Sequence, residues 1–420
     1  MGDSDRRRVV VTGLGLVTPL GTGRDEVWAS VLAGRSAAVP ITLFDTSEHI
    51  TKFACEISDF DPTVYMDAKS ARRMDRFAQF AVGAGKLAVA DAGLEIDPDD
   101  DNDRIGAIVA SGVGGLKTFE EQARILHERG PTRVSPLFIP MMIANMGAAQ
   151  LSMALGLRGP LSCPVTACAS GNHAIGDALE AIRRDQADVM LAGGAEAAIT
   201  PIGIGAFNSM KALSTRNDDP TTASRPFDVD RDGFVMGEGG AVLVLEELAH
   251  AQARGADILC EVVGYGMSGD AHHLTEPDPT AKGPARAMTM AMDNGGLNAD
   301  DIDYINVHGT STPVGDPSEV RVIQRALGVD CAARVAVSST KSMHGHMLGA
   351  TGGIEAAISA LGLRNGVIPA TINVQNLDPE CVGVDHVLDT PREAPLNAVL
   401  SNGFGFGGHN ATIAMRSFTG

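Results

Sequence analysis

The sequence Pro164-Val165-Thr166-Ala167-Cys168-Ala169-Ser170-Gly171 places a cysteine where a short apolar strand over 161–165 is expected to turn into a helix over 170–184. Small residues surround the cysteine, so a substrate can approach the backbone. The free N–H groups at the start of a helix favour a thiolate and can stabilise an oxyanion. The turn therefore predicts a nucleophilic Cys168, although an isolated cysteine is more often a buried structural residue.

Two later segments favour the nucleophile. They are Val307-His308-Gly309-Thr310-Ser311-Thr312-Pro313 and Lys341-Ser342-Met343-His344-Gly345-His346. Each carries a histidine next to a glycine, and a cysteine with two such histidines suggests nucleophilic chemistry on thioesters.

The composition limits the size of the core and the partners that the protein can have. At 420 residues with 44% hydrophobic content, the chain can bury one large core or two closely packed halves. The net charge of −19 disfavours nucleic acid as a partner. No apolar run is long enough to span a membrane, and the charged start, Met1 to Arg8, is not followed by a signal-peptide core. We therefore expect a cytoplasmic protein that does not associate with membranes.

The cysteines and histidines do not indicate a metal centre. The six cysteines show no CxxC spacing, so we expect free thiols in a reducing compartment. His344-Gly345-His346 could chelate a metal, but no third ligand accompanies the pair at a recognisable spacing. We expect no metal site.

Strands and helices alternate along the chain, which predicts an α/β fold with largely parallel sheets. We expect strands at 8–13, 105–110, 161–165, 188–193, 241–246, 259–265, 302–307, 334–338 and 397–401. We expect helices at 78–92, 144–155, 170–184, 282–294, 317–326 and 349–364.

A weak internal repeat suggests duplication. Residues 91–112 and 294–309 contain the same features in the same order. Each has the end of a helix followed by Gly-Leu, then an acidic loop, a strand that begins after an aspartate, and a turn with glycine. If the repeat is real, two halves join near 250–257 and face one another across an active site. No low-complexity linker separates the halves, so they should pack together.

The chain resembles the β-ketoacyl-acyl carrier protein synthases. The motifs at 166–171, 308–313 and 341–346, followed by Asn402-Gly403-Phe404-Gly405-Phe406-Gly407-Gly408, stand in the order of that family. The likeness covers residues 7–416 and is strongest to the elongating synthase II class. It implies the thiolase-like fold, in which two duplicated α/β halves form a five-layered α-β-α-β-α sandwich, with halves at 1–255 and 256–420.

The resemblance also implies a reaction, the decarboxylative condensation of an enzyme-bound acyl group with malonyl-acyl carrier protein in fatty acid elongation. Cys168 would carry the acyl group. His308 and His346 would donate hydrogen bonds to the enolate. Lys341, paired with Glu355, would keep His346 neutral. Decarboxylation supplies the carbanion, so no metal or redox cofactor is implied, and the substrates are carried on the phosphopantetheine of acyl carrier protein.

Further roles follow from the same resemblance. The backbone N–H groups of Cys168 and Phe406 would hold the oxyanion, and Phe406 with Phe404 would form a gate in a glycine-rich stretch that we expect to be neither strand nor helix. His344 departs from the family's usual small residue. Ile143 would come from a partner subunit, so a homodimer is implied. The substrate-contacting residues would be Thr310 and Thr312 at the pantetheine arm, His273 and Thr275 at the entrance, and Val113, Ile143 and Phe207 at the acyl chain.

Acyl carrier proteins are acidic, which suggests a use for a basic cluster on a predicted helix near residues 69–92. This cluster contains Lys69, Arg72, Arg73 and Arg76. The resemblance assigns Lys69, Arg72 and Arg73 to carrier docking, with secondary contacts from Arg133 and Lys211. Without the resemblance, such a cluster is more often an ordinary solvated face.

Four other classes of protein are alternatives to a condensing enzyme of fatty acid elongation. A non-catalytic chain-length factor would lack Cys168, and a degradative thiolase would need a second catalytic cysteine in the 402–410 loop. A type III starter synthase would carry Cys-His-Asn, which His346 excludes. A condensing enzyme of an aromatic polyketide pathway shares every catalytic residue, and only pocket shape or genomic context separates it from fatty acid elongation.

Overall fold

The computed structural model describes residues 6–419. The first part of the charged start, Met1 to Asp5, and the last residue lie outside the described residues. In residues 6–419, no helix has both the length and the apolar character needed to cross a membrane. All six cysteines are free thiols, as expected from their spacing.

One large sheet of twelve strands runs through the molecule, and it is mixed, not largely parallel as expected from the sequence. Ten of its strands fall into two sets of five. The first set is β1 (Val9–Thr18), β5 (Ile105–Ala110), β6 (Leu161–Ser162), β7 (Val189–Glu196) and β8 (Gly239–Glu247). The second set is β9 (Cys260–Gly269), β10 (Tyr304–Asn306), β11 (Ala336–Ser338), β15 (Ala398–Gly405) and β16 (His409–Arg416).

The two sets have the same topology. Across the first set the order is β6-β5-β7-β8-β1, and across the second it is β11-β10-β15-β16-β9. In each set the second strand in this order pairs in parallel with both of its neighbours, and the last three strands pair antiparallel. The sets join where β1 pairs antiparallel with β9, at Val10↔Glu261 and Val11↔Cys260. The duplication suggested by the sequence repeat is therefore present in the fold.

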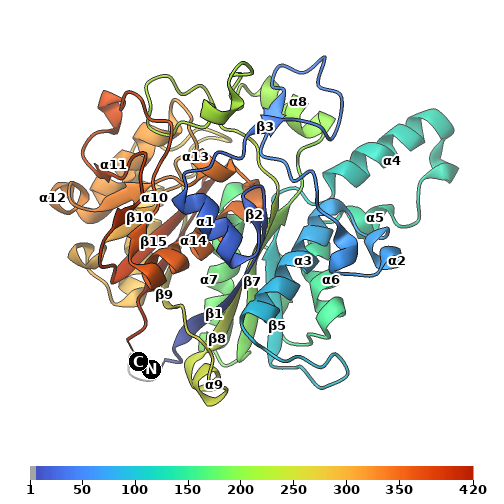
Figure 1. Cartoon of the computed structure of the whole chain (residues 1–420), viewed down its shortest axis with the longest axis horizontal. Helices are drawn as coiled ribbons and strands as arrows, with labels where there is room; N and C mark the ends of the chain where they lie inside the picture. The colour runs from blue at the N-terminus through green and yellow to red at the C-terminus, as the bar shows by residue number, and fades with distance from the viewer. Residues whose placement is uncertain (1–5, 420) are drawn as a thin grey trace.

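Helices form three layers, one outside each set of strands and one between the two sets, and with the two sets of strands they give the expected five-layered sandwich (Figure 1). Helices α3 (Arg76–Asp91) and α6 (Met146–Leu155) pack outside the first set of strands. Helices α10 (Lys282–Gly295) and α11 (Gly315–Leu327) lie outside the second set. Helices α7 (Ser170–Arg183) and α14 (Thr351–Asn365) pack against each other in the middle layer.

The alternation of side chains along the buried strands explains the layering. In β8, Leu243 and Leu245 belong to the central core with α7 and α14, whereas Val242 and Val244 belong to the outer core under α3. Successive residues of a strand point to opposite faces, so a strand covered on both sides must be apolar throughout.

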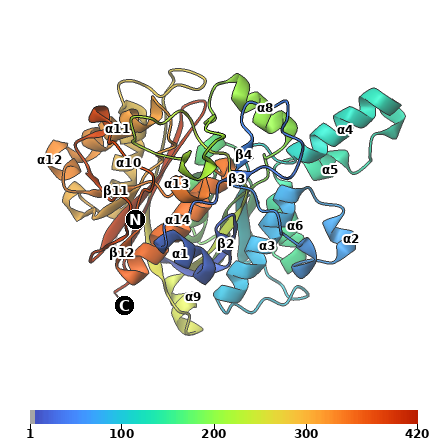
Figure 2. The ribbon, with the colours of Figure 1, turned by 45° about the horizontal axis from the view of Figure 1, so that its top comes forward.

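Shorter elements complete the fold. The remaining helices are α1 (Arg24–Leu32), α2 (Ala68–Ala71), α4 (Leu116–Arg129), α5 (Phe138–Met142), α8 (Pro201–Ser209), α9 (Leu248–Ala253), α12 (Val329–Ala332) and α13 (Lys341–His344). The remaining strands are β2 (Gly21–Thr22), β3 (Val39–Pro40), β4 (Phe53–Ala54), β12 (Val367–Ile368), β13 (Asp385–His386) and β14 (Arg392–Glu393). Helix α4, which was not expected from the sequence, projects from the body of the molecule (Figure 2).

Two local predictions are wrong. The helix expected near 69–92 is interrupted, because the Asp75 side chain accepts a hydrogen bond from the Phe77 N–H and caps a new helix, α3. The glycine-rich stretch after Asn402 is not free of regular structure. Strand β15 continues to Gly405 and pairs with β16 as far as His409, because cross-strand hydrogen bonds outweigh the low strand propensity of glycine.

Strand β1 and helix α3 approach so closely that they require glycine. A Cβ atom at Gly15 would lie 1.8 Å from the carbonyl oxygen of Ala84. No side chain fits at this distance, so the sheet and helix would have to separate.

We predict that Gly15→Ala lowers the free energy of unfolding by about 1–3 kcal/mol or more, since it overpacks this contact. Gly205→Ala is the matched control, because a Cβ atom in that helical position meets nothing within 4 Å. It should stabilise the protein by about 0.5–1 kcal/mol. Chemical denaturation measures both, and equal effects would contradict the packing argument.

Candidate active site

Cys168 lies in a single 3-10 turn, η4 (Ala167–Ala169), directly before α7. Ala167 adopts a positive φ of 51°, which bends the chain sharply into the helix. The first turn of α7 contacts that of α14, since a Cβ atom at Gly171 would lie 2.8 Å from the backbone nitrogen of Gly353. The predicted strand is shorter than expected and ends at Ser162.

The two predicted histidines lie beside Cys168. His346 Nε2 is 2.9 Å from Cys168 Sγ, and the His308 ring is perpendicular to that of His346 at a centroid distance of 5.5 Å. The three side chains line one cavity of about 780 Å³. We call them the Cys-His-His cluster.

Both histidines of the cluster are held neutral. Burial lowers the pKa of His308 and His346 well below the ordinary value, and the Lys341 ammonium lowers each further. On its other ring nitrogen, His346 Nδ1 lies 3.0 Å from Thr351 Oγ1. A hydroxyl can donate or accept, so His346 can present either a lone pair or an N–H to the cavity.

The protonation state of Cys168 differs from the thiolate that the start of a helix was expected to favour. Burial raises its pKa to about 12, although Lys341 and the backbone N–H groups of Phe406 and Cys168 act in the opposite direction. Desolvation therefore outweighs the start of the helix, and the resting nucleophile is a neutral thiol.

Lys341 and Glu355 form an ion pair behind the cluster. Lys341 Nζ donates to Glu355 Oε1 at 2.5 Å, and both side chains are buried. Burial raises the pKa of Glu355 to about 7, and Lys341 opposes that rise. Neither residue lines the cavity, so Lys341 acts on the histidines through its charge.

Two buried carboxylates that the sequence analysis missed fix the loops of the site. Glu319 accepts hydrogen bonds from the His308 and Gly309 N–H groups, both at 2.7 Å. Glu196 does the same for the N–H groups of Gly112, Val113 and Gly349 at 2.6–3.2 Å. The available signal for Glu196 was a charged residue that ends an apolar strand.

Thr310 and Thr312 line the cavity, and their hydroxyls lie 3.1 Å apart. Their loop is held by a second pair of buried charges that the sequence analysis also missed. Asp316 accepts from the N–H groups of Ser311 and Thr312, and Arg231 donates to the carbonyls of Thr312 and Pro313. The loop is therefore rigid where it faces the cavity.

The structure brings most, though not all, of the predicted substrate residues to the cavity. Phe404, Phe406, Val113, Phe207 and Thr275 line it. His273 does not, because its Nδ1 accepts from the N–H groups of Thr275 and Glu276 in an exposed turn. Ile143 is also absent from the wall and is half-buried at the end of α5.

His344 lies outside the cavity and is fully buried. Its Nδ1 is 2.8 Å from the Gly345 carbonyl oxygen, so this nitrogen must donate, and its Nε2 is 3.0 Å from Thr340 Oγ1. Both ring nitrogens are occupied, so His344 does not chelate together with His346.

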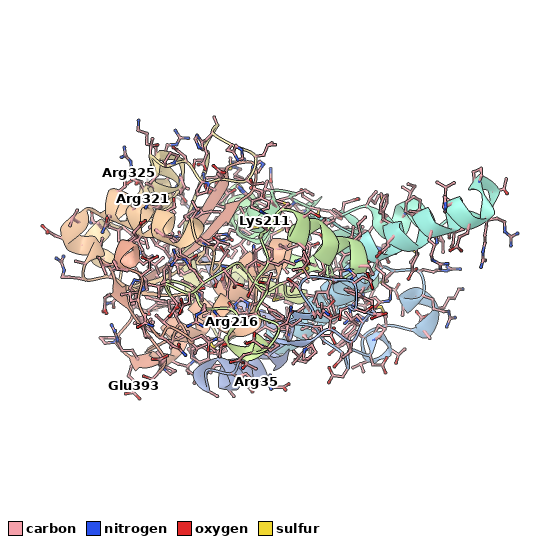
Figure 3. The ribbon with its side chains drawn as sticks, turned by 90° about the horizontal axis from the view of Figure 1, so that it is seen from above. Arg35, Lys211, Arg216, Arg321, Arg325 and Glu393 are labelled. Carbon is pink, nitrogen blue, oxygen red and sulfur yellow. The ribbon has the colours of Figure 1, made fainter. Side chains whose placement is uncertain are left out.

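The predicted docking residues are exposed. Lys69 lies in α2, Arg72 and Arg73 follow directly, and Arg133 lies beyond α4. Lys211 lies at the cavity wall, near α8 (Figure 3). Arg76 does not belong to this group, because it is half-buried and donates two hydrogen bonds to Glu238.

Five buried side-chain oxygen atoms have no hydrogen-bond partner in the described residues, and three of them, Asn306 Oδ1, Ser401 Oγ and Glu355 Oε2, belong to neighbouring elements. Asn306 and Ser401 are direct neighbours on β10 and β15, and α14, which carries Glu355, packs on β15.

Comparison with known proteins assigns the family. Residues 6–251 match the N-terminal domain of β-ketoacyl synthases, and residues 259–375 match the C-terminal domain. The chain belongs to the β-ketoacyl synthase family. A relative from Synechocystis sp., named 3-oxoacyl-[acyl-carrier-protein] synthase 2, is 50% identical over the full length of both chains. Relatives of the same name from Coxiella burnetii and Staphylococcus aureus are 48% and 47% identical over at least 98% of each chain.

Solved structures of the family superimpose closely on this synthase. A β-ketoacyl synthase from Burkholderia phymatum has a TM-score of 0.91 at 38% identity, covering 98% of this chain and all of that one. The ishigamide ketosynthase/chain length factor has a TM-score of 0.91 at 36% identity, covering 99% of this chain and all of its own. A type II PKS ketosynthase in complex with its acyl-carrier protein has a TM-score of 0.90 at 31% identity, with the same coverage.

The raised pKa of Cys168 predicts the pH dependence of its alkylation. Only the thiolate reacts, so the rate of modification by iodoacetamide should rise about tenfold per pH unit from pH 6 to pH 9 without a plateau. Peptide mass spectrometry separates Cys168 from the other cysteines, and Cys168→Ala sets the background. A plateau near pH 7 would instead show a thiolate stabilised by the helix.

Proposed function

We propose that the protein is an acyltransferase that catalyses the decarboxylative condensation of an enzyme-bound acyl group with malonyl-acyl carrier protein, giving a β-ketoacyl-acyl carrier protein in fatty acid elongation. The observation that carries the proposal is the Cys-His-His cluster, in which a thiol lies 2.9 Å from a neutral imidazole beside a second one.

The first half-reaction loads the enzyme. Cys168 Sγ attacks the thioester carbonyl of an acyl carrier and transfers its proton to His346 Nε2. The backbone N–H groups of Cys168 and Phe406 stabilise the tetrahedral oxyanion. When that intermediate collapses, the carrier thiolate leaves and takes the proton from His346.

The second half-reaction forms the carbon–carbon bond. The malonyl group loses CO₂, and the electrons of the broken bond form an enolate whose oxygen accepts hydrogen bonds from His308 and His346. The enolate carbon attacks the acyl carbonyl on Cys168, the C–S bond breaks, and the departing Cys168 thiolate takes up a proton from solvent to regenerate the thiol. Lys341 disfavours imidazolium at both histidines, so neutral N–H donors are available.

The proposed chemistry requires no metal or redox cofactor, because decarboxylation supplies the carbanion. The substrates would arrive on the phosphopantetheine arm, which Thr310 and Thr312 would contact. Phe404 and Phe406 would gate the acyl channel, which Val113 and Phe207 would line. The entrance roles proposed for His273 and Thr275 differ in support, since only Thr275 lines the cavity.

Fatty acid elongation is favoured over a polyketide pathway by the relatives. Those named 3-oxoacyl-[acyl-carrier-protein] synthase 2 are 47–50% identical. The ketosynthase of the type II PKS complex is 31% identical. A polyketide ketosynthase remains the second candidate, because it would use the same catalytic residues.

We further propose that the protein is a cytoplasmic homodimer. Each chain would divide into two halves, at residues 1–255 and 256–420. Support for the dimer comes from exposed apolar side chains around α4, α5 and the sheet edge at β6, which are Phe119, Leu126, Ile139, Met153, Leu161 and Val165. A monomer rarely exposes so many large apolar side chains in one region. Ile143, at the end of α5, would then reach the partner's pocket.

Intact-mass spectrometry tests the reaction directly. Incubation with acyl-carrier thioesters of graded length should add an acyl group to the wild-type protein, and Cys168→Ala should acquire none. Malonyl-carrier should then remove the adduct and release a β-ketoacyl carrier two carbons longer. An undiminished adduct in Cys168→Ala would show that the nucleophile is wrong, and aromatic polyketide products would favour the second candidate.

Charge reversal tests the docking surface. Arg72→Glu/Arg73→Glu should raise KM for carrier-bound substrate at least about tenfold at low ionic strength, because it repels an acidic partner. Alkylation of Cys168 by iodoacetamide should be unchanged.

Arg184→Glu/Arg364→Glu is the matched control for that experiment. Both arginines lie at or near the C-terminal ends of α7 and α14, about 20 Å from the cluster at the other ends of those helices. This control should leave KM unchanged. An equal rise in both double variants would contradict docking at α2.

A further inference from the structure

The Cys-His-His cluster also has the composition of a metal site. Cys168 Sγ and one ring nitrogen each of His308 and His346 all lie within 4.8 Å of one another. The three residues come from separate segments of the chain, so no ligand spacing exists in the sequence. The third ligand that His346 lacks along the chain is supplied in space by Cys168 and His308.

The donor set selects a particular class of cation. One thiolate and two imidazoles suit Zn²⁺ and the softer Cd²⁺, whereas Mg²⁺ and Ca²⁺ take oxygen ligands. Zinc sites with three protein ligands keep a fourth position for water or substrate. Here that position would face the cavity, because all three side chains line it.

The distances are compatible with tetrahedral coordination after small side-chain rotations. Zinc–ligand bonds of about 2.0–2.3 Å place neighbouring ligand atoms roughly 3.3–3.6 Å apart. The sulfur is 2.9 Å from His346 Nε2, and no pair in the cluster exceeds 4.8 Å. Thr351 Oγ1, 3.0 Å from Nδ1, orients the His346 ring from behind as an outer-shell partner does.

The charged groups around the cluster do not exclude a cation. Lys341 opposes it, but its ammonium is paired with Glu355 at 2.5 Å. The carboxylates of Glu196 and Glu319 both support the loops of the site and are buried. Glu355 is a third buried acid near the cluster, and burial raises the pKa of all three, so the site depends on its Cys-His-His ligands and not on a surplus of negative charge.

We propose that the Cys-His-His cluster is a reversible inhibitory site for Zn²⁺ or Cd²⁺. The metal forms a bond to Cys168 Sγ and to one nitrogen of each histidine, and the thiol proton leaves to solvent with no change of oxidation state. A metal-bound sulfur cannot attack a thioester, and an acylated sulfur cannot bind the metal as a thiolate. Metal binding and acylation therefore exclude each other.

Co²⁺ serves as a spectroscopic probe for the Zn²⁺ site. Titration of the wild-type protein should give one equivalent of Co²⁺ with a thiolate-to-metal charge-transfer band in the near ultraviolet, and Zn²⁺ should displace it. Cys168→Ala should lose the band, and His308→Ala should weaken binding at least about tenfold. Circular dichroism checks that each variant is folded.

Cys331→Ser is the matched control, because Cys331 is a free thiol outside the cluster whose Sγ contacts Asp300 Oδ1 at 3.1 Å and no histidine. This variant should keep the full band. Wild-type protein carbamidomethylated at Cys168 provides a second test that avoids mutation, and it should bind no Co²⁺ at the cluster.

A band that persists in Cys168→Ala or in the carbamidomethylated protein would overturn the proposal, as would the absence of one-equivalent binding. These measurements use no acyl substrate, so they do not depend on the condensation reaction. Failure of the acyl-transfer experiment would leave the metal result unaffected, and the two proposals can fail separately.

Discussion

The close contact between the first turns of α7 and α14 is the constraint on which the site depends. Glycines make it possible, since a Cβ atom at Gly352 would lie 2.4 Å from the backbone nitrogen of Asn172. Because the two helices meet at their N-terminal ends, Cys168 before α7 comes within 2.9 Å of His346 before α14. The duplicated topology adds His308 from the end of β10 at the same edge of the sheet.

Desolvation then decides the protonation states. The cluster lies in a region where burial lowers the pKa of both histidines and raises that of the cysteine. All three side chains are therefore neutral at rest, and the buried Lys341 adds to the effect on the histidines. The same neutral imidazoles that can donate to an enolate can also ligate a metal, which is why catalysis and inhibition would compete for one cluster.

Buried carboxylates provide the rigidity that this chemistry needs. Glu196 and Glu319 each accept several backbone N–H groups from loops that would otherwise leave buried donors unpaired. In the loop of Thr310 and Thr312, Asp316 accepts from two backbone N–H groups and Arg231 donates to two carbonyl groups. The cavity wall is thus positioned by groups that need not touch a substrate.

The sequence by itself indicated the α/β class, suggested the duplication and singled out Cys168, His308 and His346 as candidates, because periodicity and motif residues are local properties of a chain. Only the tertiary structure decided the β15–β16 hairpin through Gly405, the projecting α4 and the neutral thiol of Cys168. Those features depend on cross-strand pairing, on surfaces left outside the core and on desolvation by distant segments. No window along the chain contains that information.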